Sequence, residues 1–359
     1  MVEKIAIMTA GGDCPGLNNV IYTVTKIALA KNVKVIGVLD GYKGFVEGNY
    51  IELTEEKIKK IYEEGGTLLG SSNKECPFKY LVNKETKEYA DKTDDAIKKL
   101  NKLGINHMII VGGDGTLSAA KVISERGMNV IGIPKTIDND MFASTPTIGF
   151  QTAVENVVDS VSKLRTTAYS HNRAIIVEIM GRTSGYLTLY SGIASAADVI
   201  LLPEIEYDLD LVCDYVANLR KNGKRDIILA VSEAAKEKGK DITVSQIVED
   251  SFEKVRLGGV SKILAKQIEE KTGIETRATI LGHIQRGGVP CANDRIIATR
   301  MARRAINLLL EGKTGIIVGN SGEEVKEFEF PEKIKPRELD FENNELVKAA
   351  RDMGICLGV

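Results

Sequence analysis

The sequence lacks the features that mark secreted, membrane and zinc-binding proteins. None of its five cysteines belongs to a CxxC pair, so neither a zinc site nor a disulfide framework is indicated, and the odd count favours reduced thiols. No apolar run approaches membrane-spanning length, and the N-terminus passes directly into a strand-like KIAIMTAGG, which leaves no room for a signal peptide. We therefore expect a soluble, cytoplasmic protein.

A dominant charge is missing as well. The chain has 48 Lys and Arg against 50 Asp and Glu, a net charge of −2, so no global field draws it to nucleic acid or a membrane surface. Its composition, 43% hydrophobic and 27% charged, is ordinary for a soluble enzyme. Because 359 residues exceed one typical hydrophobic core, the length predicts two domains.

Short apolar runs alternate with longer amphipathic stretches along the whole chain, without a repeat or a low-complexity segment. The strand candidates are rich in Val and Ile, and include KIAIMTA, VKVIGVLD, INHMIIVGG, NVIGIPK, RAIIVEIM and DIILAVSEAA. This rhythm predicts an α/β fold with mostly parallel sheets and helices on both faces. Residues 141–150, MFASTPTIGF, read as a loop where the chain crosses between domains. KEFEFPEKIKPRELD near the C-terminus predicts an edge strand followed by an exposed connection.

Three loops that follow strand candidates carry glycines or carboxylates: GGDCPG at 11–16, GGDGT at 112–116 and PKTIDND at 134–140. In open α/β sheets the ligand crevice lies beyond the carboxyl ends of the strands, so all three are expected to reach it. Glycines let backbone N–H groups face an anion, and a following helix adds partial positive charge. The plainer alternative for either glycine loop is a tight turn, with Asp114 or Thr116 capping a helix.

Asp114 and the PKTIDND carboxylates suggest metal binding and proton transfer during a reaction. A carboxylate among glycines suits Mg²⁺ bridged to phosphates, since Mg²⁺ takes few protein ligands. In PKTIDND, Asp138 or Asp140 could accept a hydroxyl proton while the other orients a neighbour. As an isolated string, PKTIDND is better interpreted as a solvated turn with side-chain hydrogen bonds. Its position after a strand and near GGDGT favours the catalytic interpretation.

The second half of the chain supplies cations. His283 and Arg286 in LGHIQRGG stand beside paired glycines, as suits a phosphate ester, and Arg offers a fork geometry. Arg173, Arg182 and Arg277 flank strand candidates, although a lone Arg is equally often a surface charge. Carboxylates, glycine loops and a second cationic pocket together indicate transfer of a phosphoryl group between two phosphate-bearing substrates.

The sequence resembles the 6-phosphofructokinases over essentially its whole length. The matching strings occur in the family's order: GGDCPGLN, GGDGT, PKTIDND, GFQTA, SHNR, EIMGRTSGYLTL, LLPE and ETRATILGHIQRGG. The resemblance implies two doubly wound, Rossmann-like domains, discontinuous in sequence, with the active site in the cleft between them. Residues 1–141 and about 286–335 would form the larger, phosphoryl-donor domain. Residues 142–285 and 336–359 would form the smaller, fructose 6-phosphate domain.

The resemblance also implies roles for individual residues in glycolytic phosphorylation of fructose 6-phosphate at O1. Asp138 looks like the base, Asp114 like the Mg²⁺ ligand supported by Asp140, and Arg182 like the group that stabilises transferring charge. Gly11 would approach the transferring group through its backbone. The sugar phosphate would be held by Thr136, Met180, Gly181, Arg182, Glu233, His283 and Arg286, with Arg173 and Arg277 reaching from a neighbouring subunit of a homotetramer or homodimer. The donor would lie against Gly11, Gly12, Tyr42, Lys74, Gly113, Asp114, Gly115, Thr116 and Lys135.

The identity of the donor depends on two positions. Gly115 resembles the nucleotide-permissive glycine of the family, where an Asp would exclude the α-phosphate and favour pyrophosphate. Lys135 resembles the lysine of pyrophosphate-dependent members and stands where common bacterial ATP enzymes have Gly. We expect ATP with Mg²⁺, with pyrophosphate as the alternative, because a misplaced carboxylate excludes more strongly than an added lysine attracts.

Other departures from the family pattern concern regulation and the donor. Tyr22 and Lys26 stand where common bacterial members carry effector-binding arginines, so that control is not expected. Asn73 replaces a donor-binding arginine, for which Lys74 could substitute as a point charge. Tyr42 could flank the adenine or simply pack the turn.

NAD kinases and lipid kinases also carry GGDGT but are not expected to carry TIDND, EIMGR and LGHIQRGG. A non-catalytic sugar-phosphate sensor would not need a base at Asp138.

Overall fold

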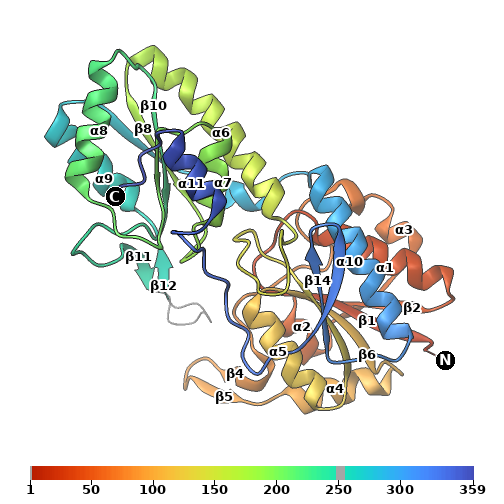
Figure 1. The fold of residues 1–359 in the computed structure, drawn as a ribbon. Coiled ribbons are helices and arrows are strands. Elements are labelled where there is room, and N and C mark those ends of the chain that lie inside the picture. Colours follow the sequence, from red (N-terminus) through yellow and green to blue (C-terminus); the bar gives the residue numbers. More distant parts are fainter. Residues whose placement is uncertain (1, 248–254) are drawn as a thin grey trace. The chain divides into compact units, whose positions relative to one another are not determined.

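The computed structural model describes residues 2–247 and 255–359, and the chain divides into two compact units. Within the described residues, unit 1 comprises 2–152 and 286–336, and unit 2 comprises 153–247, 255–285 and 337–359. Both are α/β, as the alternating pattern predicts (Figure 1). No helix in the described part of the chain combines the length and apolarity needed to cross a membrane.

Unit 1 is built on a seven-stranded mixed sheet in the order β15-β14-β7-β6-β1-β2-β3. Its strands are β1 (Lys4–Thr9), β2 (Lys34–Val38), β3 (Tyr50–Leu53), β6 (His107–Gly112), β7 (Asn129–Pro134), β14 (Ile316–Ser321) and β15 (Glu324–Glu329). The five central strands are parallel, whereas β3 and β15 run antiparallel at the edges. The edge strand predicted from KEFEF is therefore confirmed as β15.

Helices cover both faces of this sheet because its central strands are apolar on both sides. Ala6 and Met8 of β1 face a core shared with α2 (Tyr42–Glu47), α4 (Thr93–Lys102) and α5 (Asp114–Glu125). The alternate residues Ile5 and Ile7, also fully buried, point to the opposite face. There α1 (Leu17–Ala30) packs against α10 (Ala292–Leu310). The remaining elements of unit 1 are α3 (Glu55–Ile58), the 3₁₀ helices Ile61–Glu63 and Pro77–Lys79, and the hairpin β4 (Tyr80–Asn83) and β5 (Glu88–Ala90).

Unit 2 contains a four-stranded, fully parallel sheet in the order β13-β8-β10-β9. The strands are β8 (Ala174–Ile179), β9 (Val199–Leu201), β10 (Ile227–Ser232) and β13 (Thr276–Ile280). One face packs on α8 (Leu209–Lys221) and α9 (Val260–Thr272), and α7 (Tyr186–Ala194) packs on β10, β9 and α11 (Glu345–Asp352). Unit 2 also contains a small hairpin, β11 (Val244–Ile247) with β12 (Val255–Leu257), and the 3₁₀ helix η3 (Gly282–Arg286).

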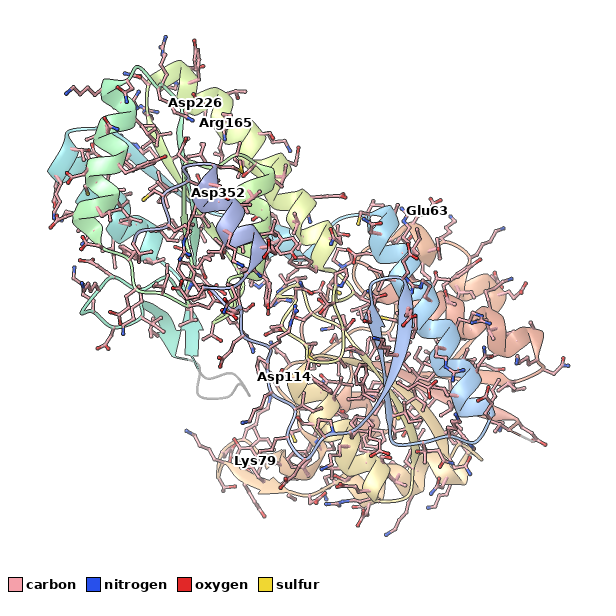
Figure 2. The ribbon with its side chains drawn as sticks, in the orientation of Figure 1. Glu63, Lys79, Asp114, Arg165, Asp226 and Asp352 are labelled. Carbon is pink, nitrogen blue, oxygen red and sulfur yellow. The ribbon has the colours of Figure 1, made fainter. Side chains whose placement is uncertain are left out.

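The first domain boundary differs from the predicted one at 141. Residues 142–152 stay with unit 1 because their backbone is bonded to it: Thr145 N donates to Asn320 O at 2.8 Å, and Gly149 N and Thr152 N each donate to the Asp294 carboxylate at 2.8 Å. Helix α6 (Phe150–His171) then carries the chain into unit 2. Arg165 fixes the helix there through an ion pair with Asp226 at 2.8 Å (Figure 2).

Candidate active site

The three predicted loops lie side by side in unit 1. Strands β1, β6 and β7 are parallel neighbours, with Thr9 paired to Val111 and Gly112 paired to Pro134. Their carboxyl ends, and hence GGDCPG, GGDGT and PKTIDND, therefore meet at one edge of the sheet. Strand order also reverses direction between β1 and β6, which is the switch point where ligands bind in open α/β sheets.

The first loop is shaped by glycines at which a side chain would either be strained, as at Gly11, or displace a neighbour, as at Gly12. Gly11 has φ +84° and donates its N–H to Ser72 O at 3.0 Å, so its close approach rather than a free N–H is what it offers a ligand. A Cβ on Gly12 would lie 2.7 Å from Nη1 of Arg286. The loop therefore presents bare backbone beside a guanidinium, which is suited to an anion.

Arg286 contacts this first loop. Its Nη1 donates to Asp13 O at 3.2 Å, and it belongs to unit 1. His283, three residues earlier, is exposed and belongs to unit 2. Arg286 also lies beside Gly12, and the phosphate pocket predicted for His283 and Arg286 stays a prediction.

The second loop opens helix α5, where Asp114 is the first residue (Figure 2). Its Oδ1 accepts the N–H of Gly115 at 2.8 Å, and its backbone oxygen accepts Ser118 Oγ at 2.8 Å. Gly112 must be glycine because a Cβ there would lie 2.4 Å from the Thr116 side chain. Both readings of Asp114, as a helix-start residue and as a metal ligand, are compatible with this geometry.

Two predicted donor contacts have different surroundings. Tyr42 is only 3% exposed, and its hydroxyl donates to Thr116 O at 2.6 Å, so the ring supports the first turn of α5 and is not available to flank an adenine. Lys74 is exposed on the loop whose Ser72 O binds Gly11 N. The Tyr42 prediction is therefore corrected to a packing role, and Lys74 stays a prediction.

The PKTIDND turn is buried, which excludes its interpretation as a solvated surface turn. Asp138 is 7% and Asn139 1% exposed. Asn139 has a left-handed φ of +55°, and its Oδ1 accepts Thr147 N at 3.1 Å. Thr147 Oγ1 donates to Thr136 O at 2.7 Å, and Thr136 Oγ1 accepts Asp138 N at 3.1 Å. Asp138 and Asp140, on either side of Asn139, thus lie on a turn that is held by hydrogen bonds from Thr147.

Lys135 brings a buried positive charge to the first loop. It is 3% exposed, and its Nζ donates to Gly12 O. Burial lowers the pKa of the ammonium from its ordinary value, and nearby Arg286 lowers it further. Lys135 and Arg286 thus place two basic side chains beside Gly12, which suits a phosphate-bearing ligand.

In unit 2, the EIMGR segment is fixed by two side chains from neighbouring segments. Glu233 follows β10, and its Oε1 accepts Gly181 N at 3.2 Å and Arg182 N at 2.9 Å. Gln285, fully buried, accepts Met180 N at 3.1 Å. The positive φ of Arg182, +52°, turns its backbone sharply. Sequence reasoning named Glu233 but missed Gln285, whose only signal was its place between His283 and Arg286.

Arg173 and Arg277 lie at the opposite end of the same sheet. Arg173 immediately precedes β8 and Arg277 is the second residue of the neighbouring β13, whereas Met180–Arg182 follow β8 and His283 follows β13. At about 3.3 Å per residue, Met180 lies roughly 23 Å along the strand from Arg173 and roughly 17 Å from the level of Arg277, which pairs with Ile175. Within one chain, these arginines therefore cannot reach a sugar phosphate bound at the carboxyl ends of β8 and β13.

Metal-binding capacity rests on single carboxylates. The described residues contain no group of three or more His, Cys, Asp and Glu side chains placed to hold an ion. Mg²⁺ is commonly bound through one or two carboxylates together with substrate phosphates and waters, so Asp114 at the loop edge fits that ion.

Comparisons with known proteins agree with this geometry. The chain matches the phosphofructokinase family over residues 4–309. It is 42% identical to ATP-dependent 6-phosphofructokinase 2 of Clostridium perfringens, covering 99% of this chain and 98% of that one. It is also 42% identical to a pyrophosphate–fructose 6-phosphate 1-phosphotransferase of Dictyoglomus thermophilum, covering 90% of each chain.

Solved structures show the same relationship. Saccharomyces cerevisiae phosphofructokinase superposes with a TM-score of 0.78 at 27% identity, covering 91% of this chain and 44% of that one. The pyrophosphate-dependent enzyme of Marinobacter aquaeolei has the same fold, with a TM-score of 0.79 at 18% identity over 100% and 93% of the chains. The chain belongs to the phosphofructokinase family.

Proposed function

We propose that this protein transfers the terminal phosphoryl group of ATP to O1 of D-fructose 6-phosphate, giving fructose 1,6-bisphosphate, as a cytoplasmic glycolytic enzyme. The observation that carries the proposal is the meeting of two glycine loops, Asp114 and the buried Asp138 at one edge of the unit 1 sheet. Relatives near 40% identity that are named ATP-dependent 6-phosphofructokinases support the same reaction.

Asp138 is the proposed base. It takes the proton of the 1-hydroxyl as that oxygen bonds to the terminal phosphorus, while the bond from phosphorus to the ADP oxygen breaks. Arg182 stabilises the charge on the transferring group, Thr136 helps to hold the sugar, and Gly11 gives close backbone approach. Asp114, with Asp140 in support, would hold Mg²⁺, which when bound neutralises phosphate charge.

The acceptor is assigned to residues that follow the strands of unit 2 and to Arg286. Met180, Gly181 and Glu233 would contact the sugar, and His283 with Arg286 the 6-phosphate, for which Arg286 would exchange its bond to Asp13 O. The placement of Arg173 and Arg277 toward the opposite end of the sheet from Met180, roughly 17–23 Å along the strands, supports their action in a neighbouring subunit. We therefore propose a self-associated enzyme, a homotetramer or homodimer, with shared active sites.

Pyrophosphate is the second candidate donor, and one observation favours it. Buried Lys135 donates to Gly12 O and adds positive charge where a compact diphosphate would be held. The Dictyoglomus relative carries a pyrophosphate-dependent name. We favour ATP because Gly115 introduces no carboxylate against a nucleotide α-phosphate, and an added lysine does not exclude one.

The test is a parallel assay of fructose 1,6-bisphosphate formation from fructose 6-phosphate and Mg²⁺ with ATP, ADP or pyrophosphate. We expect kcat/KM for ATP to exceed that for pyrophosphate by about tenfold or more, equivalent to ~1.4 kcal/mol. A preference for pyrophosphate would establish the second candidate. Turnover with none of the donors would refute the proposed reaction.

A further inference from the structure

One carboxylate holds both of the arginines assigned to a neighbouring subunit's sugar phosphate. Glu275 lies just before β13, and its Oε1 pairs with Nη2 of Arg173 at 2.8 Å and with Nη2 of Arg277. The backbone fixes this arrangement, since Ala174 N donates to Glu275 O at 3.0 Å and Arg277 pairs with Ile175 in the sheet. The two guanidinium groups therefore converge on a single oxygen atom.

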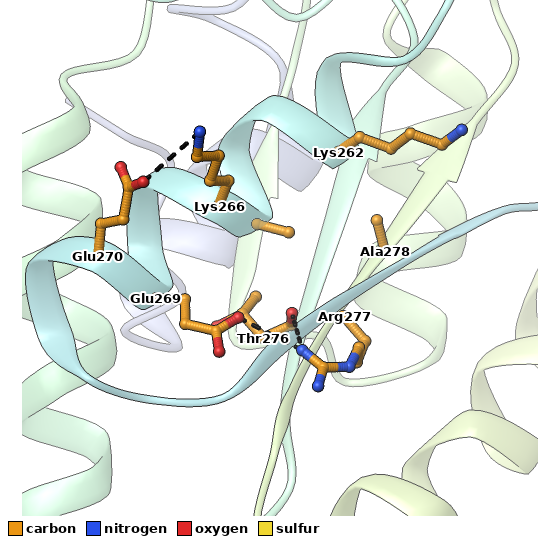
Figure 3. A pocket seen from close by; sticks show the side chains of 8 residues that line it. Lys262, Lys266, Glu269, Glu270, Thr276, Arg277 and Ala278 are labelled. Atoms are coloured by element: carbon orange, nitrogen blue, oxygen red, sulfur yellow. Dashed lines mark hydrogen bonds and ion pairs between the residues drawn. The ribbon is translucent and has the colours of Figure 1, made fainter.

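Arg277 has further partners, all weaker or neutral. Its Nη1 lies 3.3 Å from Glu269 Oε2 on α9 and donates to Thr276 O at 3.1 Å (Figure 3). These groups border a surface hollow of about 600 Å³ between α9 and β13. Arg173, by contrast, keeps a buried Nε with no hydrogen-bond partner among the described residues. Arg173 and Arg277 therefore have N–H donors that do not bond to Glu275.

A phosphate ester and a carboxylate make the same demand on an arginine fork, namely N–H donors in a plane. A phosphate carries more charge and more acceptor oxygens than Glu275, so it can engage both guanidinium groups and the spare Nε of Arg173. It can do so only by replacing, or weakening, the existing ion pairs. The ion pairs also lower the pKa of Glu275 from its ordinary value, so the competing carboxylate is ionised at neutral pH.

We propose that Glu275 is a built-in competitor of the substrate phosphate: it holds Arg173 and Arg277 together when no phosphate is present and is displaced when one binds. Glu275 thereby sets the affinity for the phosphorylated sugar. This inference rests on the proposed function, which assigns the two arginines to that ligand. The alternative role, a permanent support that orients the arginines, predicts the opposite effect of removing its charge.

The test compares Glu275→Gln with Glu270→Gln as a matched control. Glu270 lines the same hollow but is paired with Lys266, at 3.7 Å, and not with either arginine (Figure 3). Binding of fructose 6-phosphate and of inorganic phosphate is measured by calorimetry on the intact oligomer, and KM and kcat are measured separately. Glu275→Ala serves as a second variant.

We expect Glu275→Gln to bind both ligands about three- to tenfold more tightly, the scale of two partly exposed ion pairs, with the change appearing in KM rather than kcat. The gain should shrink in about 0.5 M salt, where exposed charges are screened. Glu270→Gln should change affinity less than twofold or so. Weaker or unchanged binding in both Glu275 variants would overturn the inference. Absence of fructose 6-phosphate turnover by the wild type would instead refute the proposed function, because the inorganic phosphate comparison would still report on Glu275.

Discussion

At the residue scale, the proposed chemistry uses one carboxylate, Asp138, and one lysine, Lys135, that the fold largely removes from water. Asp138 and Lys135 are both nearly buried, and they stand three residues apart on the same turn. Buried charges are retained only when partners or ligands compensate their desolvation. Lys135 is compensated in part by its hydrogen bond to Gly12 O, and in the proposed mechanism both side chains also act on a ligand.

Replacing Asp138 by Asn tests the base directly. The amide keeps the shape of the side chain but cannot accept the hydroxyl proton, so kcat should fall by about 10²- to 10⁴-fold. Calorimetric affinity for fructose 6-phosphate should stay within about threefold of wild type, since binding does not need the proton acceptor. A variant that retains most of its turnover would remove Asp138 from its assigned role.

Lys135→Met tests the buried cation through the pH dependence of stability. The folded-state pKa of Lys135 is lowered, so between that pKa and 10.5 the unfolded chain binds more protons than the folded one. The contribution of Lys135 to the free energy of unfolding therefore rises with pH between the folded-state pKa and 10.5. This contribution is lowest below the folded-state pKa.

The difference in urea midpoint between Lys135→Met and wild type should accordingly narrow as the pH rises from about 7 to 10, with the variant the more stable at pH 7. Lys135→Met should also weaken the binding of pyrophosphate by a larger factor than the binding of ATP. The measurement is the inhibition constant of each donor for the variant, divided by the same constant for the wild type. A constant midpoint difference across this range would contradict the buried-charge interpretation.

At the scale of elements, the segment 145–152 acts as a brace between α10 and the PKTIDND turn. Asp294 in the first turn of α10 accepts Gly149 N, Thr152 N and Thr152 Oγ1. Thr147 then holds Thr136 and Asn139. The turn that carries Asp138 is thus positioned by a helix that lies far from it in sequence.

Thr147→Val tests this brace by removing one hydrogen bond to Thr136 O with little change of volume. We expect a stability loss of about 1 kcal/mol and a kcat loss of about tenfold, because the base shifts relative to its proton. Thr314→Val is the matched control: its Oγ1 accepts Val130 N at 2.9 Å near the other end of β7. Equal kcat losses in both variants would show that the brace does not position the turn.

Most of the secondary-structure elements were predictable from the sequence. Val- and Ile-rich runs identified the central strands because strands buried on both faces read as continuous apolar segments. The brace was not predictable, since residues 142–152 look like an ordinary loop and their partners Asn320 and Asp294 are remote in the chain. The first domain boundary was misplaced for the same reason.

At the scale of the whole molecule, the sequence supplied residue identities but not their grouping. It named Arg173, Arg277, His283 and Arg286 as cations. Periodicity alone did not show that the first two begin strands whose far ends carry Met180 and His283. Nor did it show Arg286 against Asp13 O. Such groupings depend on strand order and on long-range contacts, which local patterns do not encode.

Shared active sites predict complementation between two inactive variants. Asp138→Asn and Arg277→Ala subunits, each inactive alone, are unfolded together and reassembled. If Asp138 of one subunit works with Arg277 of another, hybrid dimers contain one fully native site, and random mixing should restore about a quarter of wild-type activity. Sites built within single chains would give no recovery.

Unit 2 is assembled from segments separated in sequence, and the last of them has a structural task. The backbone of Cys356 forms an isolated parallel β-bridge with Val199 of β9. Ile200 N donates to Cys356 O at 2.9 Å, and Cys356 N donates to Asp198 O at 3.0 Å. A recombination event with one crossover after residue 152 therefore cannot transplant unit 2 into a relative without also replacing residues 286–336 of unit 1. Chimeras that inherit residues 153–285 from one parent need its final two dozen or so residues as well, so both stretches are constrained to evolve as a linked pair.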